Sequence, residues 1–144
     1  DLKGGAGKTE LCTYLHCKYP LRFWLVTEFR TMADIATLID NALNHEWDGH
    51  CVLLDIPRQT AEFDVVYNAM ESIKNGILTV SKYHSKLVRL PKRPHVVVLS
   101  NVFPNVRKLS LDKWKVYELC HSNGNALTRP DDVTARKVES TSLL

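Results

Sequence analysis

The sequence predicts an α/β fold built on a mostly parallel sheet. Two observations lead to this prediction: the expected strands are short and almost wholly apolar, and they alternate with helices along residues 8–100. Parallel strands are apolar throughout because helices cover both faces of their sheet. With 144 residues, 44% of them hydrophobic, the chain can form a real core. We expect this core over residues 1–120 and a polar tail over residues 121–144.

The expected helices are marked by their ends or by their periodicity. Residues 8–19 follow a glycine-rich turn and precede Pro20, which would stop a helix. Residues 32–44 and 63–73 carry apolar side chains at three- and four-residue spacing, typical of one buried helix face. Asn75-Gly76 is expected to close the last of these helices.

The expected strands fall into two groups. Three are buried apolar runs of the parallel sheet, two are joined by residues 81–86 as a hairpin, and one more follows near the end of the core. In chain order they are residues 23–27, 51–55, 77–80, 87–90, 95–100 and 116–119.

A glycine-rich turn at the start of the first helix predicts a phosphate site. Glycines let backbone N–H groups approach phosphates, and a helix N-terminus adds positive charge. Lys8 would reach the β- and γ-phosphates, and the hydroxyl of Thr9 would bind Mg²⁺. Leu2 stands where the full motif has its first glycine, and a flexible loop is the alternative. The expected nucleotide-binding residues are Gly4, Gly5, Ala6, Gly7, Lys8 and Thr9.

An acidic residue at the end of a second strand completes such a site. Asp55 ends an apolar run and would help to hold Mg²⁺, although an Asp that caps the turn before Pro57 is the alternative. Many ATPases carry a second acid next, to orient the attacking water, but this chain has Ile56 there. Glu62 and Asp64 are candidates for that role only by nearness, and solvent-exposed surface roles suit both better.

A polar side chain also follows the strand at residues 95–99. The amide of Asn101 could contact the γ-phosphate or the attacking water; a simple turn residue is the alternative.

The basic residues are concentrated in one segment. The formal net charge is +3, yet residues 72–110 contain no Asp or Glu. A basic patch confined to one segment favours a polyanionic partner. On the hairpin, such lysines could instead protect an edge strand from pairing. The basic residues of the segment are Lys74, Lys82, Lys86, Arg89, Lys92, Arg93, Arg107 and Lys108.

Other site and compartment classes are disfavoured. The four cysteines form no Cys-x-x-Cys pair, so we expect free thiols in a reducing compartment rather than disulfides or zinc. No apolar run approaches the roughly 18 residues of a membrane span, and we expect no signal peptide. The motif lies so close to residue 1 that we expect a fragment whose first strand is truncated.

Taken together, these residues resemble the superfamily 3 helicase domain of Rep, the replication initiator of circular single-stranded DNA viruses and related plasmids. The resemblance runs over residues 1–119 and rests on the order and spacing of several motifs. These are residues 4–9 (Walker A), 51–58 (a Walker B of the Asp-Ile-Pro-Arg branch), 73–83 (motif B′), 94–104 (motif C) and 109–114 (usually Asp-Arg-Trp).

The resemblance implies an AAA+-like P-loop fold with a basic β-hairpin insertion, and ATP hydrolysis with Mg²⁺ coupled to movement along single-stranded DNA. It implies a ring, commonly a hexamer, in the host nucleus, with no membrane partner. Thr9 and Asp55 would hold the metal, and Lys113 would replace an arginine finger. The implied catalytic residues are Lys8, Asp55, Asn101 and Lys113. The implied DNA contacts are Lys74, Lys82, Tyr83 and Lys86.

Three alternatives remain open at this stage. One is a superfamily 3 RNA helicase of a positive-strand RNA virus. Another is a non-catalytic Rep remnant that binds nucleic acid or oligomerises, which Leu2, Ile56 and Lys113 would support. The third is a small P-loop kinase. The tyrosines and histidines of this sequence do not show the arrangement of the family's nickase domain, so we expect no endonuclease activity from these residues.

Overall fold

The computed structural model describes residues 5–57, 63–80, 86–108, 114–121 and 133–138. The chain divides into two compact units. The larger unit is Thr9–Leu99, and the smaller unit combines Asp1–Lys8 with Ser100–Leu144.

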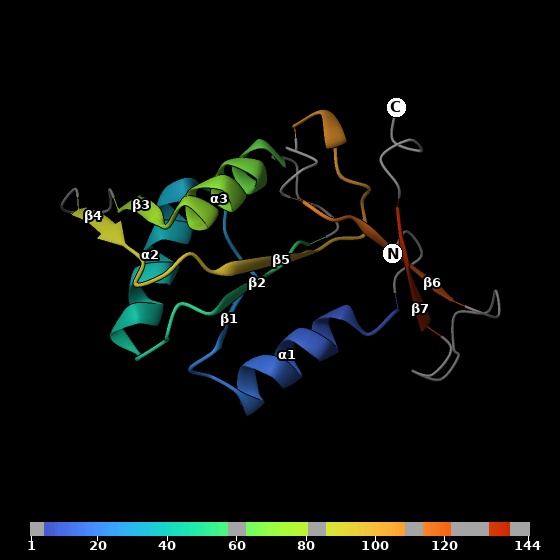
Figure 1. The fold of residues 1–144 in the computed structure, drawn as a ribbon, viewed down its shortest axis with the longest axis horizontal. Coiled ribbons are helices and arrows are strands. Elements are labelled where there is room, and N and C mark those ends of the chain that lie inside the picture. The colour runs from blue at the N-terminus through green and yellow to red at the C-terminus, as the bar shows by residue number, and fades with distance from the viewer. Residues whose placement is uncertain (1–4, 58–62, 81–85, 109–113, 122–132, 139–144) are drawn as a thin grey trace. The chain divides into compact units, whose positions relative to one another are not determined.

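A three-stranded parallel sheet forms the centre of the larger unit. It consists of β1 (Phe23–Val26), β2 (Cys51–Asp55) and β5 (His95–Leu99), in the order β1-β2-β5 (Figure 1). Leu25 lies opposite Leu53 in this register. The prediction of an α/β fold with a parallel sheet is confirmed, and the carboxyl ends of the strands meet at one edge.

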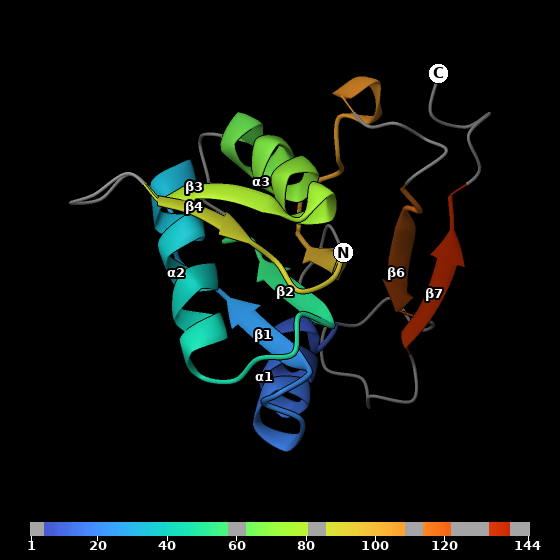
Figure 2. The same ribbon diagram turned by 60° about the vertical axis from the view of Figure 1, so that its left-hand side comes forward.

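Helices cover both faces of this sheet. Figures 1 and 2 show α1 (Lys8–Lys18) on one side, and α2 (Met32–Asn44) and α3 (Phe63–Asn75) on the other. Cys12 of α1 packs against Cys51 and Leu53, while the alternate residues of β2 are fully buried as well. Because side chains alternate across a strand, β2 is buried on both faces, which explains its uninterrupted apolar sequence.

Local hydrogen bonds fix the ends of α2 and α3. The Thr31 side chain accepts from the Asp34 N–H, and the Asp34 carboxylate accepts from the Thr31 N–H, which forms a capping box. At the end of α3, Gly76 has φ +78° and its N–H donates to the carbonyls of Ser72 and Ile73. This left-handed conformation favours glycine, so the predicted C-cap is confirmed.

A two-stranded antiparallel ribbon packs beside α2 and α3. It consists of β3 (Ile77–Val80) and β4 (Lys86–Arg89), and it buries Leu78, Val80 and Val88. The predicted strand pair is confirmed, with its second strand beginning one residue earlier. The connecting residues 81–85 lie outside the described residues.

The smaller unit contains a short 3₁₀ helix, η1 (Val106–Lys108), and an antiparallel strand pair. The pair is β6 (Tyr117–His121) with β7 (Val133–Lys137), in which Leu119 lies opposite Ala135. A strand near β6 was expected, and β7 lies within residues 121–144, for which we expected a polar tail. A five-residue polar strand has no apolar run to reveal it, because its backbone partner lies far away in sequence.

Candidate functional site

The glycine-rich turn adopts a backbone that only glycine accepts readily. Gly5 and Gly7 have φ +78° and +72°. A Cβ at Gly7 would meet no heavy atom within 4 Å, so the space beside this turn is open. Left-handed residues with room in front of them are what a phosphate-binding turn needs, because the phosphates must approach the backbone closely. Ala6 is partly buried, and Gly4 lies outside the described residues.

Within the smaller unit, Lys8 contacts Asn101. Lys8 is only 9% exposed, and its Nζ donates to Asn101 Oδ1 at 2.7 Å. A buried ammonium group needs polar partners, because removing it from water is costly. The two residues are 93 positions apart in sequence. The structure therefore brings together the predicted phosphate-binding lysine and the predicted sensor, whose roles stay predictions.

Within the larger unit, Thr9 contacts Asp55. The Thr9 Oγ1 donates to Asp55 Oδ2 at 2.6 Å, where α1 begins and β2 ends. Hydroxyl and carboxylate oxygens are ligands that suit Mg²⁺, which usually keeps several waters and phosphate oxygens as its other ligands. Among the residues that the structure describes, no group of three or more His, Cys, Asp or Glu could hold a metal. The Thr9 and Asp55 oxygens fit a metal ion whose other ligands would be phosphate and water oxygens.

The charge of Asp55 also reaches the first helix. The pKa of Cys12 is raised to about 11, first by burial and then by the charge of Asp55. Burial alone raises the pKa of Cys51 to about 11. Both thiols therefore stay protonated, whereas Cys17 is exposed on the outer side of α1.

We expect alkylation at mildly alkaline pH to label Cys17 and to spare Cys12 and Cys51. The thiolate is the reactive form, and a pKa near 11 leaves almost none of it at either buried sulfur. Peptide-resolved mass spectrometry measures the labelling, and unfolding in urea should expose both thiols as a control. Fast labelling of Cys12 in the folded chain would contradict the packing of α1 on the sheet.

The position after Asp55 belongs to the core. Ile56 is 3% exposed, and its N–H donates to the Leu99 carbonyl at 2.9 Å. This residue stabilises the end of the sheet and offers no acid for catalysis. Asp64 is exposed in the first turn of α3, and Glu62 lies outside the described residues.

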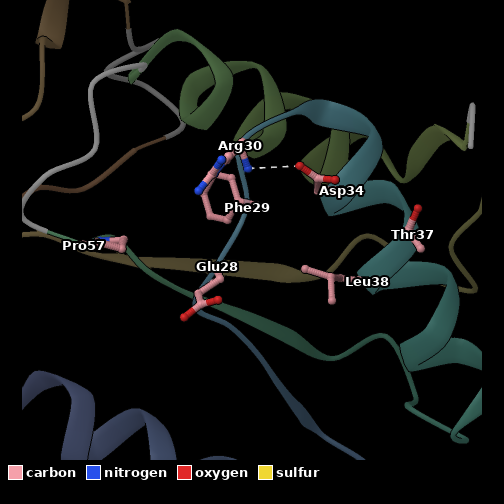
Figure 3. A pocket seen from close by; sticks show the side chains of 7 residues that line it. All are labelled: Glu28, Phe29, Arg30, Asp34, Thr37, Leu38 and Pro57. Atoms are coloured by element: carbon pink, nitrogen blue, oxygen red, sulfur yellow. Dashed lines mark hydrogen bonds between the residues drawn. The ribbon is translucent and has the colours of Figure 1, made fainter.

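A groove of about 600 Å³ opens where β1 and β2 end (Figure 3). No sequence pattern had predicted this groove. The residue that could have indicated the groove in the sequence is Glu28, an acid two residues after β1 at the same sheet edge as Asp55. Ligands of open α/β sheets bind at this edge. The groove is lined by Glu28, Phe29, Arg30, Asp34, Thr37, Leu38 and Pro57.

The predicted DNA-contacting residues are only partly described. Lys86, at the start of β4, donates to both carboxylate oxygens of Asp40 on α2, at 2.8 and 3.1 Å. Its side chain is still 59% exposed, so the ammonium remains accessible. Lys74 is partly buried in the last turn of α3. Lys82, Tyr83 and the predicted finger substitute Lys113 lie outside the described residues.

Within the described ranges, no helix combines the length and the apolar character needed to span a membrane.

Comparison with known proteins identifies relatives among alphasatellite proteins. The chain is 30% identical to Para-Rep C3 of the milk vetch dwarf C3 alphasatellite over 115 residues, 79% of this chain and 37% of the relative. It is 31% identical to Para-Rep C7 of the faba bean necrotic yellows C7 alphasatellite, over 78% of this chain and 38% of the relative. It is 32% identical to Para-Rep C10 of the milk vetch dwarf C10 alphasatellite, with the same coverage.

No protein-family profile and no solved structure matches the chain. The chain spans little more than a third of the length of the curated relatives that it matches. Over most of its own length, it is similar to alphasatellite Rep proteins, in agreement with the Rep resemblance of its motifs.

Proposed function

We propose that the chain is the ATPase domain of a Rep-like superfamily 3 helicase, which hydrolyses ATP with Mg²⁺ and moves along single-stranded DNA in rolling-circle replication. The observation that carries the proposal is a pair of contacts made by consecutive residues. Lys8 binds the Asn101 amide, and Thr9 binds the Asp55 carboxylate. Because Lys8 and Thr9 are consecutive in sequence, the proposal assigns both contacts to one nucleotide site.

Each group has a distinct role in this proposal. The backbone around Gly5 and Gly7 binds phosphate oxygens, and the Lys8 ammonium neutralises the γ-phosphate. Thr9 and Asp55 would hold Mg²⁺, which would supply positive charge to neutralise the phosphates. Phosphoryl transfer depends mainly on positioning and charge neutralisation, and these groups would supply both at the phosphates.

The DNA-binding part of the proposal rests on the β3–β4 ribbon. Residues 81–85 join the two strands in sequence and include Lys82 and Tyr83. The accessible Lys86 follows them in the sequence. Lysines can bind phosphates without reading sequence, and an aromatic ring can stack on a base. By family resemblance, we extend the proposal to a ring, commonly a hexamer, with Lys113 reaching a neighbouring subunit, and to the host nucleus.

The ATPase rate of the chain, measured with and without single-stranded DNA, tests the function. We expect Mg²⁺-dependent hydrolysis that single-stranded DNA stimulates. Stimulation by single-stranded RNA alone would instead favour the RNA helicase. Nucleotide binding without turnover would indicate a non-catalytic Rep remnant, and no nucleotide binding would refute the proposal.

Removing Lys82 and Lys86 together should weaken DNA binding and its dependence on salt. Each neutralised phosphate contributes a log–log slope of about −0.7 on single strands, so the double alanine variant should flatten the slope by about one to one and a half units. Fluorescence anisotropy over a salt series measures it. Lys92→Ala is the matched control, because Lys92 also forms an ion pair, with Asp48 at 3.3 Å.

Asp40→Asn should strengthen DNA binding and steepen its dependence on salt, in contrast to the double alanine variant. It removes the carboxylate that holds Lys86, so more of the lysine charge becomes available to phosphates. If the variant that lacks both Lys82 and Lys86 binds single-stranded DNA with the affinity and salt slope of the parent chain, the ribbon is not the DNA contact.

A further inference from the structure

Hydrolysis of ATP needs a group that orients the attacking water and accepts its proton. This inference rests on the proposed ATPase function. The usual position for that acid holds Ile56, which is buried and hydrogen-bonded through its backbone to Leu99. Another element must therefore supply the acid.

The register of the sheet places Glu28 next to the metal-binding edge. Val26, the last residue of β1, pairs with Leu54, so Glu28 follows β1 by two residues at the edge where Asp55 ends β2. Neighbouring strands lie about 4.8 Å apart. Glu28 and Asp55 therefore lie at the same edge of the sheet, after adjacent parallel strands. Both belong to the larger unit, which also contains Thr9.

The other acids at this edge already have partners. Asp55 accepts from the Thr9 hydroxyl. Asp34 accepts from the N–H groups of Arg30 and Thr31, at 3.1 and 2.9 Å, so its carboxylate is used in the cap of α2. In contrast, Glu28 is exposed and forms no hydrogen bond or ion pair with the residues that the structure describes.

The orientation of the side chain agrees with this role. Figure 3 shows the Glu28 carboxylate pointing away from α2 and Asp34, toward the side of the sheet on which α1 lies. The first turn of α1 carries Thr9, the partner of Asp55. An unpartnered carboxylate directed to that side can accept a hydrogen bond from a water beside the γ-phosphate.

We infer that Glu28 is the general base of ATP hydrolysis in this chain. The water oxygen forms a bond to the γ-phosphorus while the bond from that phosphorus to the β–γ bridging oxygen breaks. The bonding electron pair leaves with ADP. The proton of the water passes to the Glu28 carboxylate and is then released to phosphate or solvent, so the acid is regenerated.

Glu28→Gln tests the inference, because glutamine keeps the size of the side chain and removes its basicity. A positioned general base contributes about 10²- to 10⁴-fold to a rate. We expect kcat to fall by about 10²-fold or more, while the Kd for ATP and the thermal midpoint stay at their parent values. A purely structural role would change the midpoint or the Kd instead.

Matched variants separate the possible failures. Glu46→Gln, at an exposed acid after α2, should leave kcat unchanged. A parent kcat in Glu28→Gln would overturn the inference while the ATPase proposal stands, and loss of kcat in Asp64→Asn alone would assign the base to α3. If the parent chain binds no nucleotide, the proposed function fails. If it binds ATP without turnover, the inference on Glu28 fails.

Discussion

Lys8→Ala is expected to abolish ATP hydrolysis by this chain. The ammonium of Lys8 is buried, and it is the charged side chain that we propose to bind phosphate at the glycine-rich turn. Charge-assisted hydrogen bonds contribute about 1.5–3 kcal/mol each. Their loss should lower ATP affinity by roughly one to two orders of magnitude, and the transition state should lose still more because negative charge develops on the transferred group.

A matched lysine of the same helix controls for this effect. Lys18, in the last turn of α1, donates to the Tyr14 hydroxyl at 2.6 Å and lies over the Tyr19 ring. Lys18→Ala should bind and hydrolyse ATP like the parent. Calorimetric titration with ATP and a phosphate-release assay measure both variants, and hydrolysis at the parent rate in Lys8→Ala would refute the P-loop assignment.

Asp55→Ala should remove the dependence of nucleotide binding on Mg²⁺. The substitution deletes one proposed metal ligand and the acceptor of the Thr9 hydroxyl, so the second proposed ligand also loses its orientation. We expect ATP affinity in Mg²⁺ to fall to the value measured in EDTA. Titrations in the two buffers give the comparison, and Asp48→Ala, at the opposite end of β2, is the control.

A second measurement on Asp55→Ala is independent of any ligand. The charge of Asp55 is the second-largest cause that raises the pKa of Cys12, after burial. Its removal should lower that pKa while burial keeps it above 9, the ordinary value. The pH dependence of Cys12 alkylation reports the change. An unmoved pKa would mean that α1 does not begin beside the end of β2.

The sequence was sufficient for the elements whose signals are local. Helix α2 has the predicted bounds because its amphipathic pattern and its capping box agree. Strand β2 was predicted because residues buried on both faces form an apolar run. For β7, a polar strand stabilised by pairing with β6, no such signal exists.

In the candidate site, too, the features that local sequence patterns encode were predicted, and those that depend on residues distant in sequence were not. The glycine-rich turn was recognisable as a motif, and its positive φ angles follow from its composition. The ion pair of Lys86 with Asp40 joins residues 46 positions apart, which no local pattern reveals. Glu28 was missed because its nearness to Asp55 depends on strand order and register.

The central claim is that Lys8, Thr9, Asp55 and Asn101 act on one nucleotide. A crystal structure of the chain with a non-hydrolysable ATP analogue and Mg²⁺ tests this claim most directly. We predict the Lys8 ammonium between the β- and γ-phosphates, the Asn101 amide at the γ-phosphate, and Mg²⁺ about 2.1 Å from the Thr9 hydroxyl. A nucleotide bound elsewhere, or with its phosphates directed away from the glycine-rich turn, would contradict the account.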